Sequence, residues 1–172
     1  MARPKSATHD LKRDEILDIA AQCFADGSYP ATSMNTIAAA GGTSKARLYH
    51  YYDSKEAILF DLLDRYTQRL LALIGESQAV AERGNLDDRA SLHELIRRFL
   101  QEYENSATRH VALVSDTQFL GPEQRALIVG RQRDVVAAFT RFLKRAYPER
   151  LTAANQTAVT MMLFGIDRKS VV

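Results

Sequence analysis

The chain has 172 residues, a length that suits one compact domain or a small domain joined to a larger helical one. Hydrophobic residues make up 46% and charged residues 26%, which is typical of a folded globular protein and argues against intrinsic disorder. The net charge of +2 does not by itself indicate a nucleic-acid partner, so any electrostatic argument has to be local. A single cysteine excludes a disulfide framework and a cysteine-rich zinc site.

Membrane and secretion signals are missing from the sequence pattern. The chain has no run of about 18 apolar residues, and residues 1–15 are polar without the apolar core of a signal peptide. We therefore expect a cytoplasmic protein with no membrane partner. The eight Gly and four Pro residues are sparse, and patterns typical of strands are almost absent, so we predict an all-α fold.

Apolar residues recur at three- and four-residue steps along most of the chain, which is the pattern of amphipathic helices. We expect residues 1–11 to form a disordered polar arm before the first helix. The expected helices cover about 13–24, 34–40, 45–51, 55–74, 92–103, 110–120 and 122–147, with a last one after Thr152 that contains the apolar run 159–166.

Residues 31–56 carry the most informative pattern, because two short helices are predicted on either side of a glycine turn. With the preceding amphipathic helix, this is the layout of a helix-turn-helix module, whose second helix enters the DNA major groove. Residues 27–52 contain no Asp or Glu, whereas Lys45 and Arg47 lie among them, so the module is locally positive. Nearby tyrosines offer hydroxyls and aromatic faces that suit phosphate, sugar and thymine-methyl contacts.

Residues 16–59, ILDIAAQCFADGSYPATSMNTIAAAGGTSKARLYHYYDSKEAIL, resemble the TetR family of bacterial repressors. The resemblance rests on the end of the first helix, Thr-Ser before the second, Gly-x-Ser before the third, and Leu-Tyr and Ser-Lys-Glu at fixed spacing. It implies a DNA-binding domain over residues 1–54 and a helical effector-binding and dimerisation domain over residues 55–172.

The resemblance also implies residue roles in binding a double-stranded, palindromic operator. Lys45 and Arg47 would begin the recognition helix and read bases or phosphates, and Lys55 would pair with a phosphate. Leu48 and Tyr52 would pack inside the module. The full set of expected DNA contacts is Ser33, Asn35, Thr43, Ser44, Lys45, Arg47, Tyr49, His50, Tyr51 and Lys55. Ala46 and Arg47 depart from the usual family pattern, which is expected to alter the operator sequence and leave the binding mode intact.

The resemblance further implies a homodimer that a small-molecule effector releases from DNA, with the helix over 55–74 as the mechanical link. Candidate effector contacts are Tyr103, His110, Asp116, Gln118 and Phe119, although Phe119 also suits a core and Asp116 and Gln118 a solvated turn. Residues 109–125 resemble regulators of aromatic-acid or fatty-acyl degradation, which implies an aromatic-acid or acyl-CoA effector. Neither a metal nor another cofactor is expected, because His93 and His110 have no second ligand at the fourth position after them.

The C-terminal end departs from the family pattern, because the apolar run stops at residues 167–172 and no ninth helix follows. We expect either a truncated last helix or a naturally short member with a different dimer surface. No enzyme is expected, since GGTSK lacks the spacing of a phosphate-binding loop and no catalytic motif is recognised. The alternative function is a helical small-molecule- or protein-binding module with impaired DNA regulation.

Overall fold

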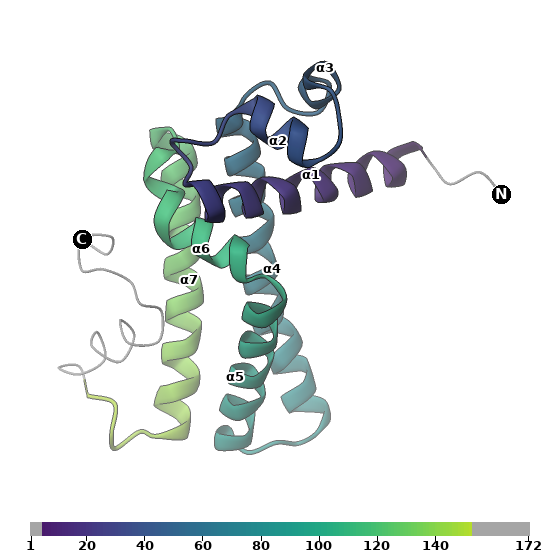
Figure 1. Ribbon diagram of the computed structural model, residues 1–172. Helices are drawn as coiled ribbons and strands as arrows, with labels where there is room; N and C mark the ends of the chain where they lie inside the picture. The colour runs from purple at the N-terminus through teal and green to yellow at the C-terminus, as the bar shows by residue number, and fades with distance from the viewer. Residues whose placement is uncertain (1–4, 153–172) are drawn as a thin grey trace. The chain divides into compact units, whose positions relative to one another are not determined.

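The computed structural model describes residues 5–152, and within that range the chain is built of helices without a strand (Figure 1). The all-α fold expected from the sequence is confirmed. The elements are α1 (Lys5–Gly27), α2 (Met34–Ala40), α3 (Lys45–Tyr49), α4 (Lys55–Arg83), α5 (Asp88–Asn105), α6 (Ala107–Asp116), the 3-10 helix η1 (Thr117–Phe119) and α7 (Pro122–Ala146). The expected last helix, with the apolar run 159–166, lies outside the described residues. None of the described helices combines the length and the apolar character that a membrane span requires.

The backbone packs into two compact units. We call the first the head unit; its described residues are 5–66 and 107–125. We call the second the helical unit; its described residues are 67–106 and 126–152. This division differs from the expected one after residue 54, because the start of α4 and all of α6 pack with the N-terminal helices. The expected division concerns function and stays a prediction.

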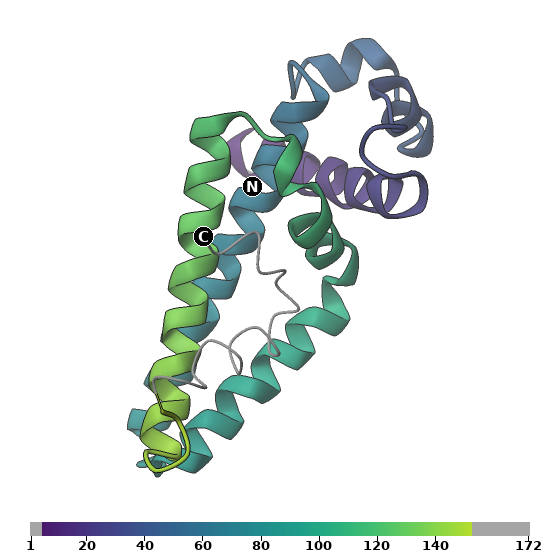
Figure 2. The ribbon, with the colours of Figure 1, turned by 90° about the vertical axis from the view of Figure 1, so that its left-hand side faces the viewer.

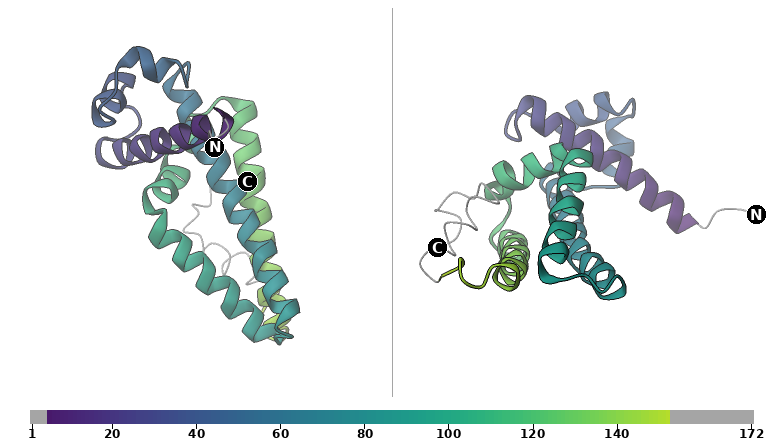
Figure 3. Two further views of the ribbon diagram at one scale, coloured as in Figure 1. Left: turned by 90° about the vertical axis from the view of Figure 1, so that its right-hand side faces the viewer. Right: turned by 90° about the horizontal axis from the view of Figure 1, so that it is seen from below.

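Helix α1 is the central packing element of the head unit. Its residues Leu17, Ala20 and Phe24 are at most 3% exposed, and α2 and α6 both pack against it (Figure 2; Figure 3). The helix begins at Lys5 and not near residue 13, so the expected polar arm is helical from Lys5 onward. The physical reason is that no Gly or Pro interrupts residues 5–26, and Pro4 is tolerated next to a first helical turn.

The helical unit contains the second half of α4 with α5 and most of α7. Its core includes Leu95 and Phe99 of α5 and Val135 and Phe139 of α7, and the Phe99 and Phe139 rings meet edge to face with centroids 4.6 Å apart. Helix α4 continues through Gly75 to Arg83, further than the expected end near residue 74, because a single Gly costs a helix little when tertiary packing holds it.

Candidate nucleic-acid interface

Helix α2 begins at a reciprocal cap. The Ser33 hydroxyl oxygen accepts a hydrogen bond from the Thr36 amide at 3.1 Å, and the Thr36 hydroxyl oxygen accepts one from the Ser33 amide at 3.3 Å. This capping box satisfies N–H groups that a first helical turn otherwise leaves without partners. Ile37 and Ala38 are buried while Asn35 is exposed, so one face of α2 is anchored and the other meets solvent.

A glycine turn separates α2 from α3. The Gly42 amide donates to the Ala39 carbonyl at 3.1 Å, and the Thr43 amide donates to the Ala38 carbonyl at 2.9 Å. These two bonds form a Schellman motif, which requires a left-handed residue after the helix, and Gly42 has φ +58°. The turn therefore depends on glycine at this position and directs the chain into Ser44.

Helix α3 is capped by Ser44, whose hydroxyl oxygen accepts from the Arg47 amide at 3.2 Å. Leu48 is 1% exposed and anchors the helix, whereas Lys45, Arg47 and Tyr49 are exposed. The Lys45 ammonium lies 5.7 Å from the centre of the Tyr49 ring. The short helix thus presents two cations and an aromatic ring to solvent, on a segment without acidic residues.

The residues that follow α3 divide between surface and interior. Tyr51 is half-buried, and its ring contacts those of His9 and His50, with centroids 4.9 Å and 5.4 Å away. Tyr52 is 3% exposed and Leu48 is buried, as the sequence predicts for both. The tilted contact between the His9 and Tyr51 rings joins α1 to the segment directly after α3.

The Tyr52 hydroxyl belongs to a charged network that joins α1 to α4. It donates to a carboxylate oxygen of Asp61 at 2.6 Å and accepts from Arg13 Nε at 3.2 Å. Asp61 also accepts from Arg13 at 2.9 Å and from Arg65 at 3.0 Å. Burial acts to raise the pKa of the Asp61 carboxyl, but hydrogen bonds from Tyr52 and Arg65 and the charges of both arginines outweigh it, and the pKa is lowered. The carboxylate therefore holds the two helices together as an anion.

Lys55 lies at the start of α4 and holds the loop before α2. Its ammonium donates to the carbonyl of Tyr29 at 2.6 Å and to that of Thr32 at 2.7 Å, and lies 4.2 Å from the centre of the Tyr29 ring. An ammonium has three N–H donors, so a phosphate contact is compatible with these bonds. The expected phosphate contact of Lys55 stays a prediction, and the structure adds a packing role.

All the expected DNA contacts lie in the head unit, within residues 33–55. Seven are exposed and three are partly exposed. The exposed ones are Ser33, Asn35, Ser44, Lys45, Arg47, Tyr49 and His50, and the partly exposed ones are Thr43, Tyr51 and Lys55. Sequence reasoning missed His9, which contacts Tyr51. The unbroken helical stretch after Pro4 is the sequence signal that could have extended α1 to this residue.

The candidate effector contacts do not fall in one unit. Tyr103 lies on α5 in the helical unit, with its ring edge-on to Phe99 at 6.1 Å, and burial raises the pKa of Tyr103 to about 12. His110 lies on α6 in the head unit, where its ring meets that of Tyr66 at 6.2 Å, and burial lowers the pKa of its imidazole. Their assignment to an effector site stays a prediction.

The remaining effector candidates lie at the end of α6 and in η1. Asp116 is 7% exposed, and burial raises the pKa of its carboxyl. The Gln118 amide donates to the Ser115 carbonyl at 2.9 Å. The Phe119 ring stacks on Tyr29 with centroids 4.9 Å apart and planes 21° apart. Phe119 thus has a packing contact within the head unit.

The three-helix head, with a capped helix, a glycine turn and a second capped helix, defines a helix-turn-helix protein. Residues 16–62 match the family model of the bacterial regulatory proteins of the tetR family. A crystal structure of a TetR-family transcriptional regulator from Bordetella parapertussis is 32% identical in sequence, with a TM-score of 0.81 over 89% of this chain and 78% of that chain. The chain belongs to the TetR family.

Other relatives agree with this assignment. The HTH-type transcriptional repressor KstR2 of Rhodococcus jostii is 39% identical over 85 residues, which is 49% of this chain. The match spans 40% of the repressor's own length. A crystal structure of AibR in complex with isovaleryl coenzyme A and operator DNA is 22% identical, with a TM-score of 0.69 over 91% of this chain and 87% of that chain, which is a likeness of fold.

Proposed function

We propose that this protein is a DNA-binding transcriptional repressor that a small-molecule effector releases from its operator. The observation that carries the proposal is α3 itself. Ser44 caps it and Leu48 anchors it, while Lys45 and Arg47 stay exposed on a segment without acidic residues. Membership of the TetR family supports the same function, and operator binding would place the protein in the cytoplasm.

In this proposal α3 enters the major groove and Arg47 reads a guanine. A guanidinium can donate two parallel hydrogen bonds to the guanine edge, which separates the right base from a wrong one by roughly 1–3 kcal/mol. Ser33, Tyr49 and Lys55 would contact phosphates and set the register without reading sequence. Two heads in a homodimer would bind half-sites about 34–36 Å apart, which makes the operator palindromic.

Effector control would work through two states of the dimer. A ligand that binds better to a form with the wrong spacing of the heads shifts the protein off DNA, in proportion to its difference in affinity for the two forms. Helix α4 contributes residues to both units, which suits it to transmit such a change. The AibR complex with isovaleryl coenzyme A supports an acyl-CoA effector, and an aromatic acid is the second candidate.

The DNA-binding part is tested by fluorescence anisotropy on duplexes tiled across the DNA upstream of the protein's own gene, with a shuffled duplex as control. We expect one duplex to bind roughly 10³-fold or more tightly than the control, which is the lower range for specific binding. Equal, salt-sensitive binding to all duplexes would contradict the repressor proposal.

The effector part is tested on the protein–operator complex by adding isovaleryl coenzyme A or benzoate, with free coenzyme A as a control. Release of DNA by one compound and not by free coenzyme A supports effector control. Calorimetric binding of a compound by a protein that shows no operator preference would favour the alternative of a helical binding module without DNA regulation.

A further inference from the structure

The first turns of α1 lie beside the recognition helix within the head unit. The His9 ring contacts the Tyr51 ring at 4.9 Å with planes 35° apart, and Tyr51 in turn meets His50 edge-on at 5.4 Å. His9 and His50 are both exposed. The surface that begins on α3 therefore continues across Tyr51 onto α1.

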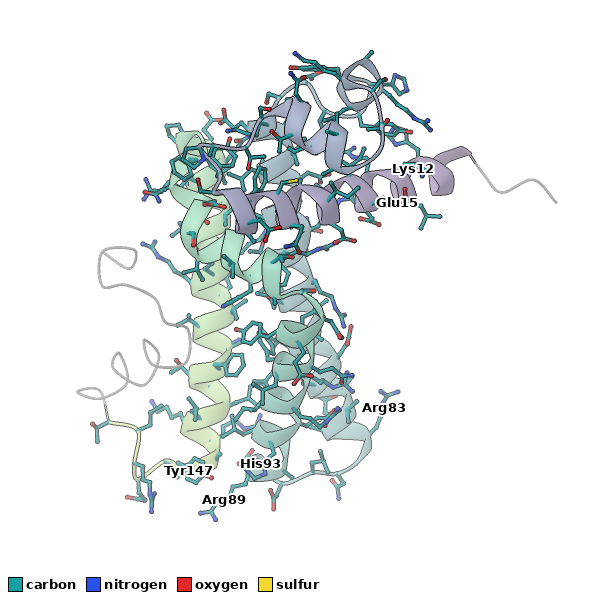
Figure 4. All side chains as sticks on the ribbon, viewed as in Figure 1. Lys12, Glu15, Arg83, Arg89, His93 and Tyr147 are labelled. Atoms are coloured by element: carbon teal, nitrogen blue, oxygen red, sulfur yellow. The ribbon has the colours of Figure 1, made fainter. Side chains whose placement is uncertain are left out.

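A pocket of about 200 Å³ lies where α1 meets α3 and Tyr51. Lys12 and Glu15 of α1 line it together with Arg47 and Tyr51. Figure 4 labels Lys12 and Glu15 on the N-terminal half of α1. Two cations from different helices, Lys12 and Arg47, thus line one pocket, although 35 positions separate them in the sequence (47 − 12).

Lys12 forms a solvent-exposed ion pair with Glu15, which a DNA phosphate can replace. Its ammonium pairs with the Glu15 carboxylate at 2.5 Å, and the two side chains are 45% and 58% exposed. An ion pair this exposed is weak and is screened by salt. A DNA phosphate can therefore compete with Glu15 for the Lys12 ammonium, while Glu15 itself repels the phosphate.

We propose that His9 and Lys12 on α1 form a second DNA contact, which binds the sugar–phosphate backbone beside the base pairs read by α3. Glu15 weakens this contact, because it pairs with Lys12 and adds a negative charge at the same place. The contact carries no sequence information, since it reaches phosphates and not base edges. The inference rests on the proposed DNA-binding function and adds a contact outside the helix-turn-helix segment.

The first test measures the salt dependence of binding for Lys12→Gln on the operator and on a shuffled duplex. Loss of one phosphate contact lowers the slope of log affinity against log salt by about 1, and affinity falls to a similar extent on both duplexes. We expect a loss of roughly 3- to 10-fold at moderate salt. Lys144→Gln, which removes an exposed lysine from α7 in the helical unit, is the matched control and is expected to leave the slope unchanged.

The second test predicts a gain of affinity. Glu15→Gln releases Lys12 and removes the repelling charge, so both duplexes are expected to bind roughly 3- to 10-fold more tightly. Asp26→Asn is the control for charge alone, because Asp26 is an exposed acid near the other end of α1. His9→Ala is expected to weaken binding on both duplexes without loss of operator preference.

Unfolding cannot mimic these results, since a smaller folded fraction lowers apparent affinity without changing the salt slope or raising affinity. If Lys12→Gln and Glu15→Gln behave like their controls on both duplexes, the α1 contact is wrong even where operator preference is found. If wild type shows no operator preference, the repressor proposal fails, while the salt slopes on the shuffled duplex still decide the α1 contact. Absence of any DNA binding would overturn both.

Discussion

At the scale of single residues, Ser28 holds an unfavourable backbone conformation directly after α1. Its φ of 66° lies in the left-handed region, where an L-residue with a Cβ atom costs roughly 1–2 kcal/mol relative to glycine. Ser28→Gly is therefore expected to raise the free energy of unfolding by about 1 kcal/mol. In a protein of this size that corresponds to roughly 2–4 °C in Tm, measured by thermal unfolding followed by circular dichroism.

Gly42→Ala tests the reverse change, in which a residue with a Cβ atom replaces glycine in the left-handed region. The φ of Gly42 is +58°, and a Cβ atom added there meets no heavy atom within 4 Å, so the cost of Gly42→Ala comes from the backbone alone. We expect a loss of about 1 kcal/mol in the free energy of unfolding. Unchanged stability in both variants would show that these two residues do not hold left-handed conformations in solution.

The Asp61 network predicts sensitivity to acid. The pKa of Asp61 is lowered from its ordinary value of 3.8, so its contribution to stability is fully present above that value and is lost as pH falls through the folded-state pKa. Asp61→Asn is expected to cost about 2 kcal/mol at neutral pH, because it removes charge-assisted hydrogen bonds to two arginines. We expect the free energies of unfolding of wild type and variant, measured by urea unfolding at a series of pH values, to become equal below pH 3.8.

Tyr52→Phe is the control for this acid effect. It removes the hydroxyl that donates to Asp61 and accepts from Arg13, but it leaves both arginine contacts of the carboxylate. We expect a loss of about 1 kcal/mol at neutral pH. The variant should keep part of its acid sensitivity through the two arginines, because the Tyr52 hydrogen bond is the largest of the causes that lower the pKa of Asp61. A variant with the full acid sensitivity of wild type would contradict the assigned network.

Local residue roles were predictable from the sequence where the partner is close in the chain. The caps at Ser33 and Ser44 and the glycine turn follow from residue type and spacing over a few positions. The bonds from Lys55 to the carbonyls of residues 29 and 32 were not predictable, because they join positions 26 and 23 residues apart. Such contacts depend on how helices pack, which one sequence does not reveal.

At the scale of elements, α6 and η1 are joined to the rest of the head unit by several contacts. Phe119 stacks on Tyr29, and Arg109 donates to Asp18 at 3.0 Å. The Gly121 amide, directly before α7, donates to Glu56 at 3.0 Å. The ion pair is partly exposed and is worth about 0–1 kcal/mol, so the aromatic stack is expected to contribute more.

A double-mutant cycle with Tyr29→Leu and Phe119→Leu measures this stack. The interaction energy is expected to be roughly 0.5–1.5 kcal/mol in urea unfolding. A second cycle pairs Phe119→Leu with Tyr49→Leu and serves as the control, because the Tyr49 ring contacts the Lys45 ammonium instead of Phe119. Equal interaction energies in the two cycles would contradict a specific Tyr29–Phe119 contact.

Helix boundaries were predictable where capping residues mark them. Helix α2 covers Met34–Ala40 as predicted, and α7 starts at Pro122 as predicted. Helices α1 and α4 are longer than predicted, because polar residues at 5–12 and Gly75 were interpreted as breaks. A helix can continue through a polar stretch when no turn residue ends it. Hydrophobic periodicity alone therefore underestimates the length of helices whose ends are exposed.

At the scale of the whole molecule, the chain divides by packing at other residues than the sequence pattern predicts. The sequence pattern separates a DNA-binding segment at residue 54, whereas α6 and η1 pack into the head unit with α1, α2 and α3. In sequence, these two elements are separated from α3 by α4 and α5, so their placement was not predictable from a local motif. The helix-turn-helix motif was predictable because it is continuous in the chain, and the DNA contacts of its residues stay a prediction.

The central claim is that α3 reads DNA sequence through Arg47. The most direct measurement is the ratio of the Kd for a shuffled duplex to the Kd for the operator, compared between wild type and Arg47→Ala, with Lys144→Ala as the control. We predict that Arg47→Ala lowers this ratio by roughly 5- to 150-fold, which corresponds to the 1–3 kcal/mol of one bidentate base contact. An Arg47→Ala variant that is folded and keeps the wild-type ratio would contradict the claim.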